Sequence, residues 1–464
     1  MSFLENNSDN SLECIIVGHE KKLLAEGLEL RHGKLSLIET HQCHPKNWPL
    51  SRKIYDTGIM FLLELVTTMV SNTGSLSAFA AHEELRISRE QALAAFTTTY
   101  LVAQAIGSIV ISPYTECYGR RSTYIASATV FAITTAVVGF SQGLAPILLG
   151  RLMSGLASAV PTTVLGGSIE DIWDIKARIW VIDLWVLHAI IGVAVAPAYA
   201  VAIASSLGWK DHLNKNYAQL ALSLPDDDLT PSLVDFAKNR VKKPLVLLCT
   251  QPLLLVVTVM SASVYGFAYL LTEELPRIYA TFGFNELQSS FVYMALCGGA
   301  VLALIMRLQD ARVVKKRDLQ NQALIPEDKL TGFYVAAPLQ AIAFWVFAWS
   351  IAPLGYHQTP AISIITIIPI GFALNEFDHV LLGYIVDMYT EDASSACAPL
   401  GALRAILSAV MPLAGLKMFE RLDNNLAASV IAIIATVYCA FAAVFYCYGI
   451  KLRMASLRKK NALG

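Results

Sequence analysis

The chain has 464 residues, of which 55% are hydrophobic and only 15% are charged. Soluble proteins carry about 25% charged residues, so this composition excludes an ordinary soluble protein. The mean hydropathy of +0.53 includes polar ends, which indicates internal segments apolar enough to cross a bilayer about 30 Å thick. The formal net charge of −1 gives no electrostatic reason to expect nucleic acid as a partner. We therefore expect a polytopic protein of the lipid bilayer.

Residues 1–50 precede the first apolar segment. They lack the basic start and compact apolar core of a secretory signal, so we predict a mobile cytosolic tail. The group His41-Gln42-Cys43-His44 lies in this tail without a second ligand pair, and no metal site is expected. The 8 cysteines of the chain show no CxxC spacing, which argues against a disulfide framework.

Eleven hydrophobic segments follow, each near the 20 residues that a spanning helix needs. They lie near residues 56–80, 91–113, 122–142, 144–168, 179–207, 244–271, 288–308, 331–353, 361–387, 396–418 and 424–450. Glycine and proline inside several of them are tolerable, because neighbouring helices can satisfy the freed backbone groups. The predicted fold class is all-α.

Basic residues mark the loops that should face the cytosol under the positive-inside rule. They precede the first, third, fifth and sixth segments and follow the seventh and eleventh: Arg52, Lys53, Arg120, Arg121, Lys176, Arg178, Lys242, Lys243, Arg307, Arg312, Lys315, Lys316, Arg317, Lys451, Arg453. The fifth segment should then end outside, near Trp209, whereas the sixth should begin inside, near Lys243. One crossing is missing between them. Residues 211–243 cannot supply it in lipid, because they contain Asp226-Asp227-Asp228 and no apolar run of spanning length.

The loop after the second segment contains a short signature, Glu116-Cys-Tyr-Gly119-Arg120-Arg121. The glycine turn allows the two helices to meet closely, and Glu116 can pair with Arg120 or Arg121. Topology signalling alone is the alternative role for these basic residues. The pattern resembles the cytosolic signature of the major facilitator superfamily.

Two further stretches strengthen this resemblance. Arg151 and Gly155 in the fourth segment are similar to the Arg-x-x-x-Gly helix of that superfamily's drug:proton antiporters. Tyr384-x-x-Asp387 and Leu403-Arg404 resemble the fungal branch, and we expect a cytosolic gate that includes Asp387 and Arg404. Arg151 should face a cavity or a partner, although snorkelling to the membrane surface is an alternative.

The resemblance implies two helical halves of six helices, twelve in all. We expect halves at 51–210 and 244–455, a polar central loop at 211–243 and a cytosolic tail at 456–464. The sixth helix of the family, which should follow Gly208-Trp209, is absent. The fifth segment keeps Gly192 and Pro197 of the family's Gly-Pro-rich run, and a helix bend is expected at Pro197.

Polar residues inside the apolar segments are the candidate site. Those expected to line a proton or substrate pathway are Glu64, Asn72, Arg151, Gly155, Tyr265, Tyr269, Asn375, Glu376 and His379. Three ionisable groups at 376–379 are costly in a membrane, and a carboxyl group shielded from water can bind and release a proton. An internal Glu–His pair, or aromatic residues that only pack, are the structural alternatives. Glu273 and Glu274 are expected at a solvated outer rim.

No nucleotide loop or hydrolase motif is present, so neither an enzyme nor a cofactor is expected. The leading hypothesis is a secondary active transporter that exports a small organic molecule, such as a drug, toxin or fungal secondary metabolite, by proton antiport. Its partners would be this substrate, protons and the bilayer, and we expect a monomer in the plasma membrane or, alternatively, the vacuolar membrane. A non-transporting or truncated product of the same family and a polyamine transporter are the alternatives. Without a sixth helix, we predict that the chain as written does not cycle normally.

Overall fold

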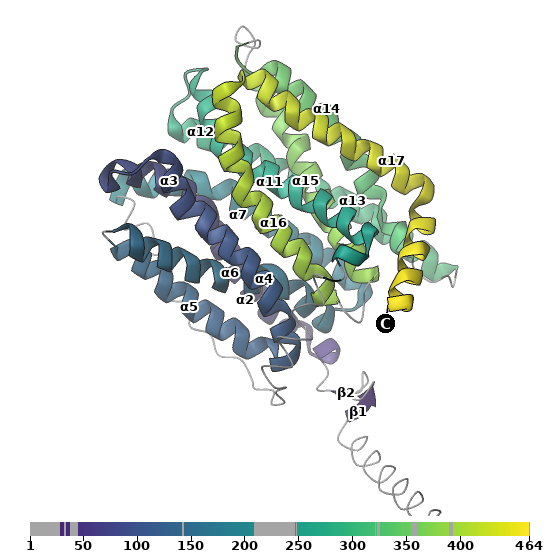
Figure 1. The fold of residues 1–464 in the computed structure, drawn as a ribbon. Coiled ribbons are helices and arrows are strands. Elements are labelled where there is room, and N and C mark those ends of the chain that lie inside the picture. The colour runs from purple at the N-terminus through teal and green to yellow at the C-terminus, as the bar shows by residue number, and fades with distance from the viewer. Residues whose placement is uncertain are drawn as a thin grey trace, which may run out of the picture.

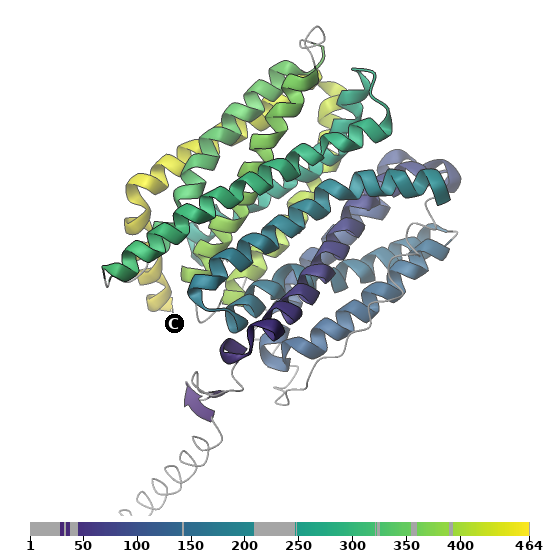
Figure 2. The same cartoon turned by 180° about the vertical axis from the view of Figure 1, so that it is seen from behind.

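The computed structural model describes residues 28–31, 34–37, 45–141, 143–207, 246, 248–320, 322, 325–353, 360–388 and 393–463. In this part of the chain the architecture is a bundle of long helices (Figures 1 and 2). A short antiparallel pair, β1 (Leu28–Arg31) and β2 (Lys34–Leu37), precedes the bundle within the predicted N-terminal tail. The predicted central loop at 211–243 lies outside the described residues.

The first half contains five membrane-length helical segments. After the short turn η1 (Pro45–Asn47), its elements are α2 (Leu50–Leu85), α3 (Arg89–Leu93), the π-helical turn η2 (Ala94–Thr98), α4 (Thr99–Tyr118), α5 (Arg120–Phe140), α6 (Leu144–Ile172) and α7 (Ile175–Leu207). Ser88 and Gln91 form a capping box at the start of α3, where α2 has ended. Gly119 separates α4 from α5 with a φ of +84°, a conformation that favours glycine.

The second half contains six membrane-length segments. Its elements are α11 (Pro252–Ala280), α12 (Glu286–Val292), α13 (Met294–Leu319), η4 (Pro326–Lys329), α14 (Thr331–Ser350), α15 (Pro360–Met388), α16 (Ala393–Arg421) and α17 (Asn424–Leu463). The described residues thus provide eleven helices long and apolar enough to cross a membrane. The predicted all-helical membrane fold with eleven segments is confirmed.

The two halves repeat one packing scheme. In the first half α2 packs on α7, and α6 packs on both α4 and α5. In the second half α11 packs on α16, and α15 packs on both α13 and α14. The remaining large contact of the second half, α14 against α17, has no counterpart among the described residues of the first (Figure 1). This is the position that a sixth helix would occupy.

The end of α7 and the start of α11 lie at opposite faces of the bundle. An ion pair between Arg178 and Asp387 ties the first turn of α7 to the last turn of α15. The helix α12, which follows α11 on the outer side, also contacts α7. At this end of α11, Glu274 and Arg277 lie within electrostatic range of Arg89, which follows the outer end of α2. Both halves therefore have the orientation that their charges indicate.

Adjacent glycines on α13 give a matched test of the helix packing. A Cβ added at Gly299 would lie 1.9 Å from the carbonyl oxygen of Ile368 on α15, whereas one added at Gly298 would meet nothing within 4 Å. We expect Gly299→Ala to cost about 1–3 kcal/mol, because α13 and α15 must separate. Gly298→Ala, at an exposed position of the same helix, should stabilise the protein by up to about 1 kcal/mol. Thermal unfolding of the purified variants measures both, and equal midpoints would contradict the α13–α15 packing.

Candidate functional site

A buried ionic cluster centres on Arg307 of α13. Its guanidinium contacts both carboxylate oxygens of Glu376 on α15 at 2.6 and 2.5 Å, and Asp310 on its own helix at 2.7 Å. The Nε atom lies 3.4 Å from Asp183 on α7, in the other half of the molecule. Gly332 of α14 makes room for Glu376, since a Cβ there would lie 1.7 Å from the carboxylate. The cluster thus connects the two halves inside the membrane.

Two more polar residues of α15 complete this Arg307 cluster. Asn375 donates a hydrogen bond to Asp183 at 3.1 Å, and the Nδ1 atom of His379 lies 3.7 Å from the same carboxylate. The predicted shared face of Asn375, Glu376 and His379 therefore meets a partner that comes from α7. Glu376 pairs with Arg307 rather than with His379, so the predicted alternative of a Glu–His pair is wrong.

The charges of the Arg307 cluster do not balance when every carboxyl group is ionised. One guanidinium faces the carboxyl groups of Asp183, Asp310 and Glu376, and the side chains of all four are 3% exposed or less. Uncompensated charge in a membrane interior is costly. Bound protons are the simplest way to restore the balance, so the cluster is chemically suited to proton storage.

A second cluster centres on Arg404 of α16. Its guanidinium forms an ion pair with Asp378 of α15 and lies 4.1 Å from the ring centroid of Tyr265. Tyr265 and Ser261, both on α11, donate hydrogen bonds to Asp378 at 3.2 Å. Glu64 of α2, in the first half, lies within electrostatic range of Arg404 and Asp378. This Arg404 cluster again sets two carboxyl groups against one cation.

Glu64 is the least engaged carboxyl group of the two clusters. Its side chain is buried at 4% exposure, and its Oε2 atom has no hydrogen-bond partner among the described residues. A buried polar atom without a partner is uncommon and points to a bound proton, water or ligand. Glu64 therefore fits its predicted place in a proton or substrate pathway, which stays a prediction.

Tyr269, one turn after Tyr265 on α11, also joins the two halves. Its hydroxyl lies 2.9 Å from that of Ser71 and accepts a hydrogen bond from Asn72 at 3.3 Å. Both partners lie on α2, so the predicted pathway residues Asn72 and Tyr269 contact one another directly. Tyr265, in contrast, belongs to the Arg404 cluster.

Arg151 of α6 is buried at 1% exposure. It donates a hydrogen bond to the carbonyl oxygen of Val70 on α2 at 3.4 Å and lies over the rings of Phe96 and Tyr100. The snorkelling alternative is therefore wrong for this residue. Its position stabilises the contact of α2, α4 and α6.

Gly155 and Gly192 of the first half serve helix packing. A Cβ on Gly155 would lie 2.2 Å from the carbonyl oxygen of Tyr100, so this glycine sits against the backbone of α4. One on Gly192 would crowd Thr68 of α2 at 3.1 Å. Neither glycine borders the ionic clusters. Pro197 lies within the continuous helix α7, and the bend expected there stays a prediction.

The cytosolic signature is built around Arg120. Its guanidinium donates hydrogen bonds to the carbonyl oxygen of Val164 and the hydroxyl of Ser168, at 3.2 and 3.3 Å, and pairs with Asp171 at 3.0 Å. All three partners lie on α6, so Arg120 locks α5 to α6 within one half. The side chain of Glu116 lies outside the described residues. Arg121 follows Arg120 directly and therefore lies on a different face of α5.

The cytosolic gate differs from the prediction. Asp387 accepts ion pairs from Arg178 of α7 at 3.3 Å and from Lys329 of η4 at 2.6 Å. Arg404 binds Asp378 inside the membrane instead, so the predicted grouping of Arg404 with Asp387 is wrong. Arg178 and Asp387 join the two halves at the cytosolic end.

Comparisons with known proteins agree with this architecture. A family model described as Major Facilitator Superfamily matches residues 59–210 of the chain. A multidrug transporter of Candida glabrata is 25% identical over 89% of this chain and 78% of its own length. An efflux pump of Floropilus chiversii is 26% identical over 88% of this chain and 82% of its own length. Residues 59–210 thus match the major facilitator superfamily. The chain is a multi-pass membrane transporter rather than an enzyme.

A solved structure of the same superfamily supports the fold. The proton:xylose symporter XylE superposes with a TM-score of 0.62 at 12% sequence identity, over 85% of this chain and 96% of the symporter. Among the described residues of the chain, no group of three or more His, Cys, Asp or Glu side chains is placed to hold a metal ion.

Sequence reasoning missed several members of the clusters. Arg307 was assigned to a cytosolic loop, because it lies at the edge of the expected seventh segment; the structure extends that segment to Arg317 and buries Arg307 completely. Asp183 escaped notice, although a lone acid within an apolar segment is itself a functional signal. Glu273 and Glu274 are buried at 6% and 1% exposure, so their expected solvated rim is also wrong.

We predict that Arg307→Gln destabilises the protein by about 3–5 kcal/mol, because it leaves three buried carboxyl groups without their cation. Thermal unfolding and abundance in membranes measure this loss. Arg312→Gln, an exposed arginine on the same helix, is the matched control and should change little. Adding Glu376→Gln to Arg307→Gln should restore part of the stability. A variant Arg307→Gln as stable as Arg312→Gln would show that the cluster is not held by charge pairing.

Proposed function

We propose that the chain is built to export a small organic molecule in exchange for protons, with Glu64 as the proton carrier. The observation that carries this proposal is the position of Glu64 on α2, across the interface between the halves from the ion pair of Arg404 and Asp378. Tyr265, Tyr269 and Asn72 surround the same region from α11 and α2. Carboxyl and aromatic groups together favour flat, lipophilic cations.

The exchange follows from competition for one carboxylate. An ionised Glu64 attracts Arg404 or a cationic substrate, whereas a protonated Glu64 attracts neither. Proton entry from the outer side therefore expels the substrate, and proton loss on the cytosolic side restores the site. The efflux and multidrug functions named for the fungal relatives support export as the direction. We propose a monomer in the plasma membrane, with the vacuolar membrane as the alternative.

Binding of tetraphenylphosphonium, a lipophilic cation, tests this competition without requiring a full transport cycle. We expect the Kd of the unmodified protein to rise as the pH is lowered, since protonation removes the attracting charge. Glu64→Gln should raise the Kd about tenfold, equivalent to one lost charge interaction of about 1.4 kcal/mol, and make it independent of pH.

Glu90→Gln is the control for this experiment, because Glu90 is an exposed carboxylate outside the proposed site. Its Kd should follow that of the unmodified protein at every pH. An unchanged pH dependence in Glu64→Gln would remove Glu64 from the proton path. Spermidine, used as a competitor, distinguishes a polyamine site from one for lipophilic cations.

A non-transporting member of the same family is the second candidate, and a specific observation favours it. The first half has five membrane-length segments in the described part of the chain, while the end of α7 and the start of α11 lie at opposite faces. Alternating access needs two halves that move as rigid bodies. A half without its sixth helix exposes packing surfaces built for a neighbour.

We predict that the chain as written takes up no tetraphenylphosphonium into proteoliposomes under an imposed pH gradient. A chimera that replaces residues 208–251 with the corresponding segment of the Candida glabrata transporter should do so, because it restores the missing crossing. Dissipating the gradient is the control in both cases. Equal uptake by the chain and the chimera would contradict the prediction and show that a five-helix half is sufficient.

A further inference from the structure

In the part of the chain that the structure describes, the first half has an open packing position where the second half is filled. On one side of α14 lies α15; on the other lies α17, through ring contacts of Phe333 with Phe445 and Tyr334 with Tyr446 and a hydrogen bond from Trp345 to Thr436. The counterpart of α14 is α5. Among the described residues, α5 packs on α6 and, less extensively, on α4. A surface that a helix covers in one half is therefore uncovered in the other.

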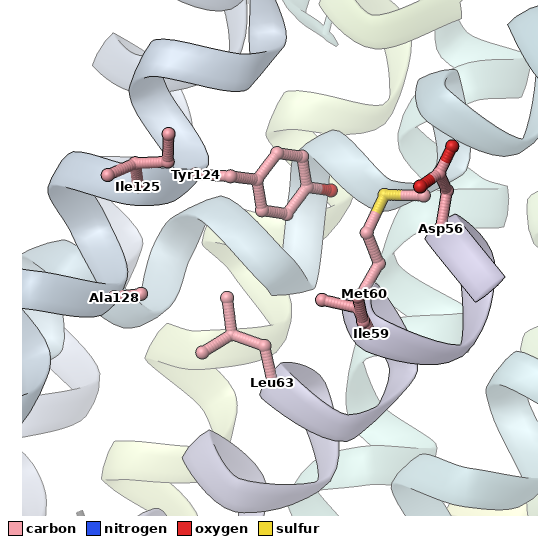
Figure 3. A pocket seen from close by; sticks show the side chains of 7 residues that line it. All are labelled: Asp56, Ile59, Met60, Leu63, Tyr124, Ile125 and Ala128. Atoms are coloured by element: carbon pink, nitrogen blue, oxygen red, sulfur yellow. The ribbon is translucent and has the colours of Figure 1, made fainter. Parts of the chain in front are cut away.

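An apolar cavity of about 50 Å³ marks this position, between α2 and α5 (Figure 3). It is lined by Asp56, Ile59, Met60 and Leu63 of α2 and by Tyr124, Ile125 and Ala128 of α5. Asp56 and Tyr124 supply the polar groups of this lining, and the other side chains are hydrocarbon or thioether. The two lining helices both begin at the cytosolic side, at Leu50 and Arg120, so the cavity lies in the cytosolic half of the membrane.

The cytosolic rim of the cavity is basic. Arg121 lies three and four residues before Tyr124 and Ile125 and so occupies the same face of α5 one turn nearer the cytosol. Arg52 lies four residues before Asp56 on α2, with its Nε atom 3.7 Å from that carboxylate, and its side chain is 46% exposed. An apolar floor with two guanidinium groups at one end is complementary to a molecule with an apolar chain and an anionic head.

We propose that this α2–α5 groove binds an anionic phospholipid of the cytosolic leaflet, which replaces part of the packing of the absent sixth helix. A short part of one acyl chain would enter the cavity, and the phosphate would lie at Arg121 and Arg52. The anionic lipids of the cytosolic leaflet attract basic residues by about 1 kcal/mol each. A second copy of the chain fits less well, because each copy would bring two arginines and a single carboxylate, Asp56, and the interface would carry excess positive charge.

Native mass spectrometry of the purified full-length chain tests the proposal. Delipidated protein is offered phosphatidylserine or phosphatidylcholine with identical acyl chains. We expect about tenfold tighter retention of phosphatidylserine, and a rise of the thermal unfolding midpoint with that lipid alone. Arg121→Gln should remove most of this preference. The assay involves no transport, so its outcome is independent of the proposed export function.

Groove-filling variants separate the cavity from general lipid contact. Ala128→Trp fills the cavity and should reduce retention of both lipids. Ala128→Leu adds a smaller side chain, should have the same effect, and replaces the tryptophan variant if that variant does not fold. Ile133→Trp, on the exposed outer face of α5, is the matched control and should retain phosphatidylserine normally. Equal retention of the two lipids by the unmodified chain, unaltered binding by both Ala128 variants, or a dimer mass in place of bound lipid would overturn the proposal.

Discussion

Every charge placed inside a bilayer needs a partner, and this constraint organises the centre of the molecule. Arg307 and Arg404 each face carboxyl groups of other helices, Arg307 also faces Asp310 of its own helix, and some of the partners come from the opposite half. The ion pairs cannot be formed unless α7, α13, α15 and α16 take their observed positions. The same contacts that define the fold therefore set up an interface whose stability we expect to depend on the protonation of its carboxyl groups.

Close helix packing makes these distances possible. Gly299 and Gly371 let α13 and α15 approach until backbone touches backbone, and this approach brings Arg307 to Glu376. In the first half Gly155 serves the same purpose between α6 and α4. No described helix of the first half takes the place of α17, which leaves this scheme incomplete beside α5, away from the ionic clusters. The candidate site and the gap are thus separate features, and a chain could bind substrate well while cycling poorly.

The sequence was sufficient to predict the helices, because apolar segments of spanning length have few alternatives in lipid. It also pointed to Glu64, Glu376 and His379, whose positions in mid-segment are costly without a function. It could not show which charges meet. Arg404 and Asp387 were grouped by their order along the chain, yet Arg404 binds Asp378, which lies deeper in the membrane on the same helix as Asp387.

Arg307 shows the other limit of sequence reasoning. A basic residue at the edge of an apolar segment fits a loop and a buried site equally well, and the choice depends on Asp183, which lies 124 residues earlier in the numbering, on α7. The partner that distinguishes the two readings is visible once the helices are assembled. For the same reason the sequence predicted a missing helix, but neither the gap beside α5 nor the basic rim of its cavity.

The central claim is that buried carboxyl groups outnumber their cations and therefore hold protons at the interface between the halves. Infrared difference spectroscopy of the purified protein tests it directly, since a protonated carboxyl group has a C=O stretching band that its ionised form lacks. We predict such a band at neutral pH, lost at alkaline pH and weakened in Glu64→Gln. A neutral-pH spectrum with no protonated carboxyl band would contradict the account.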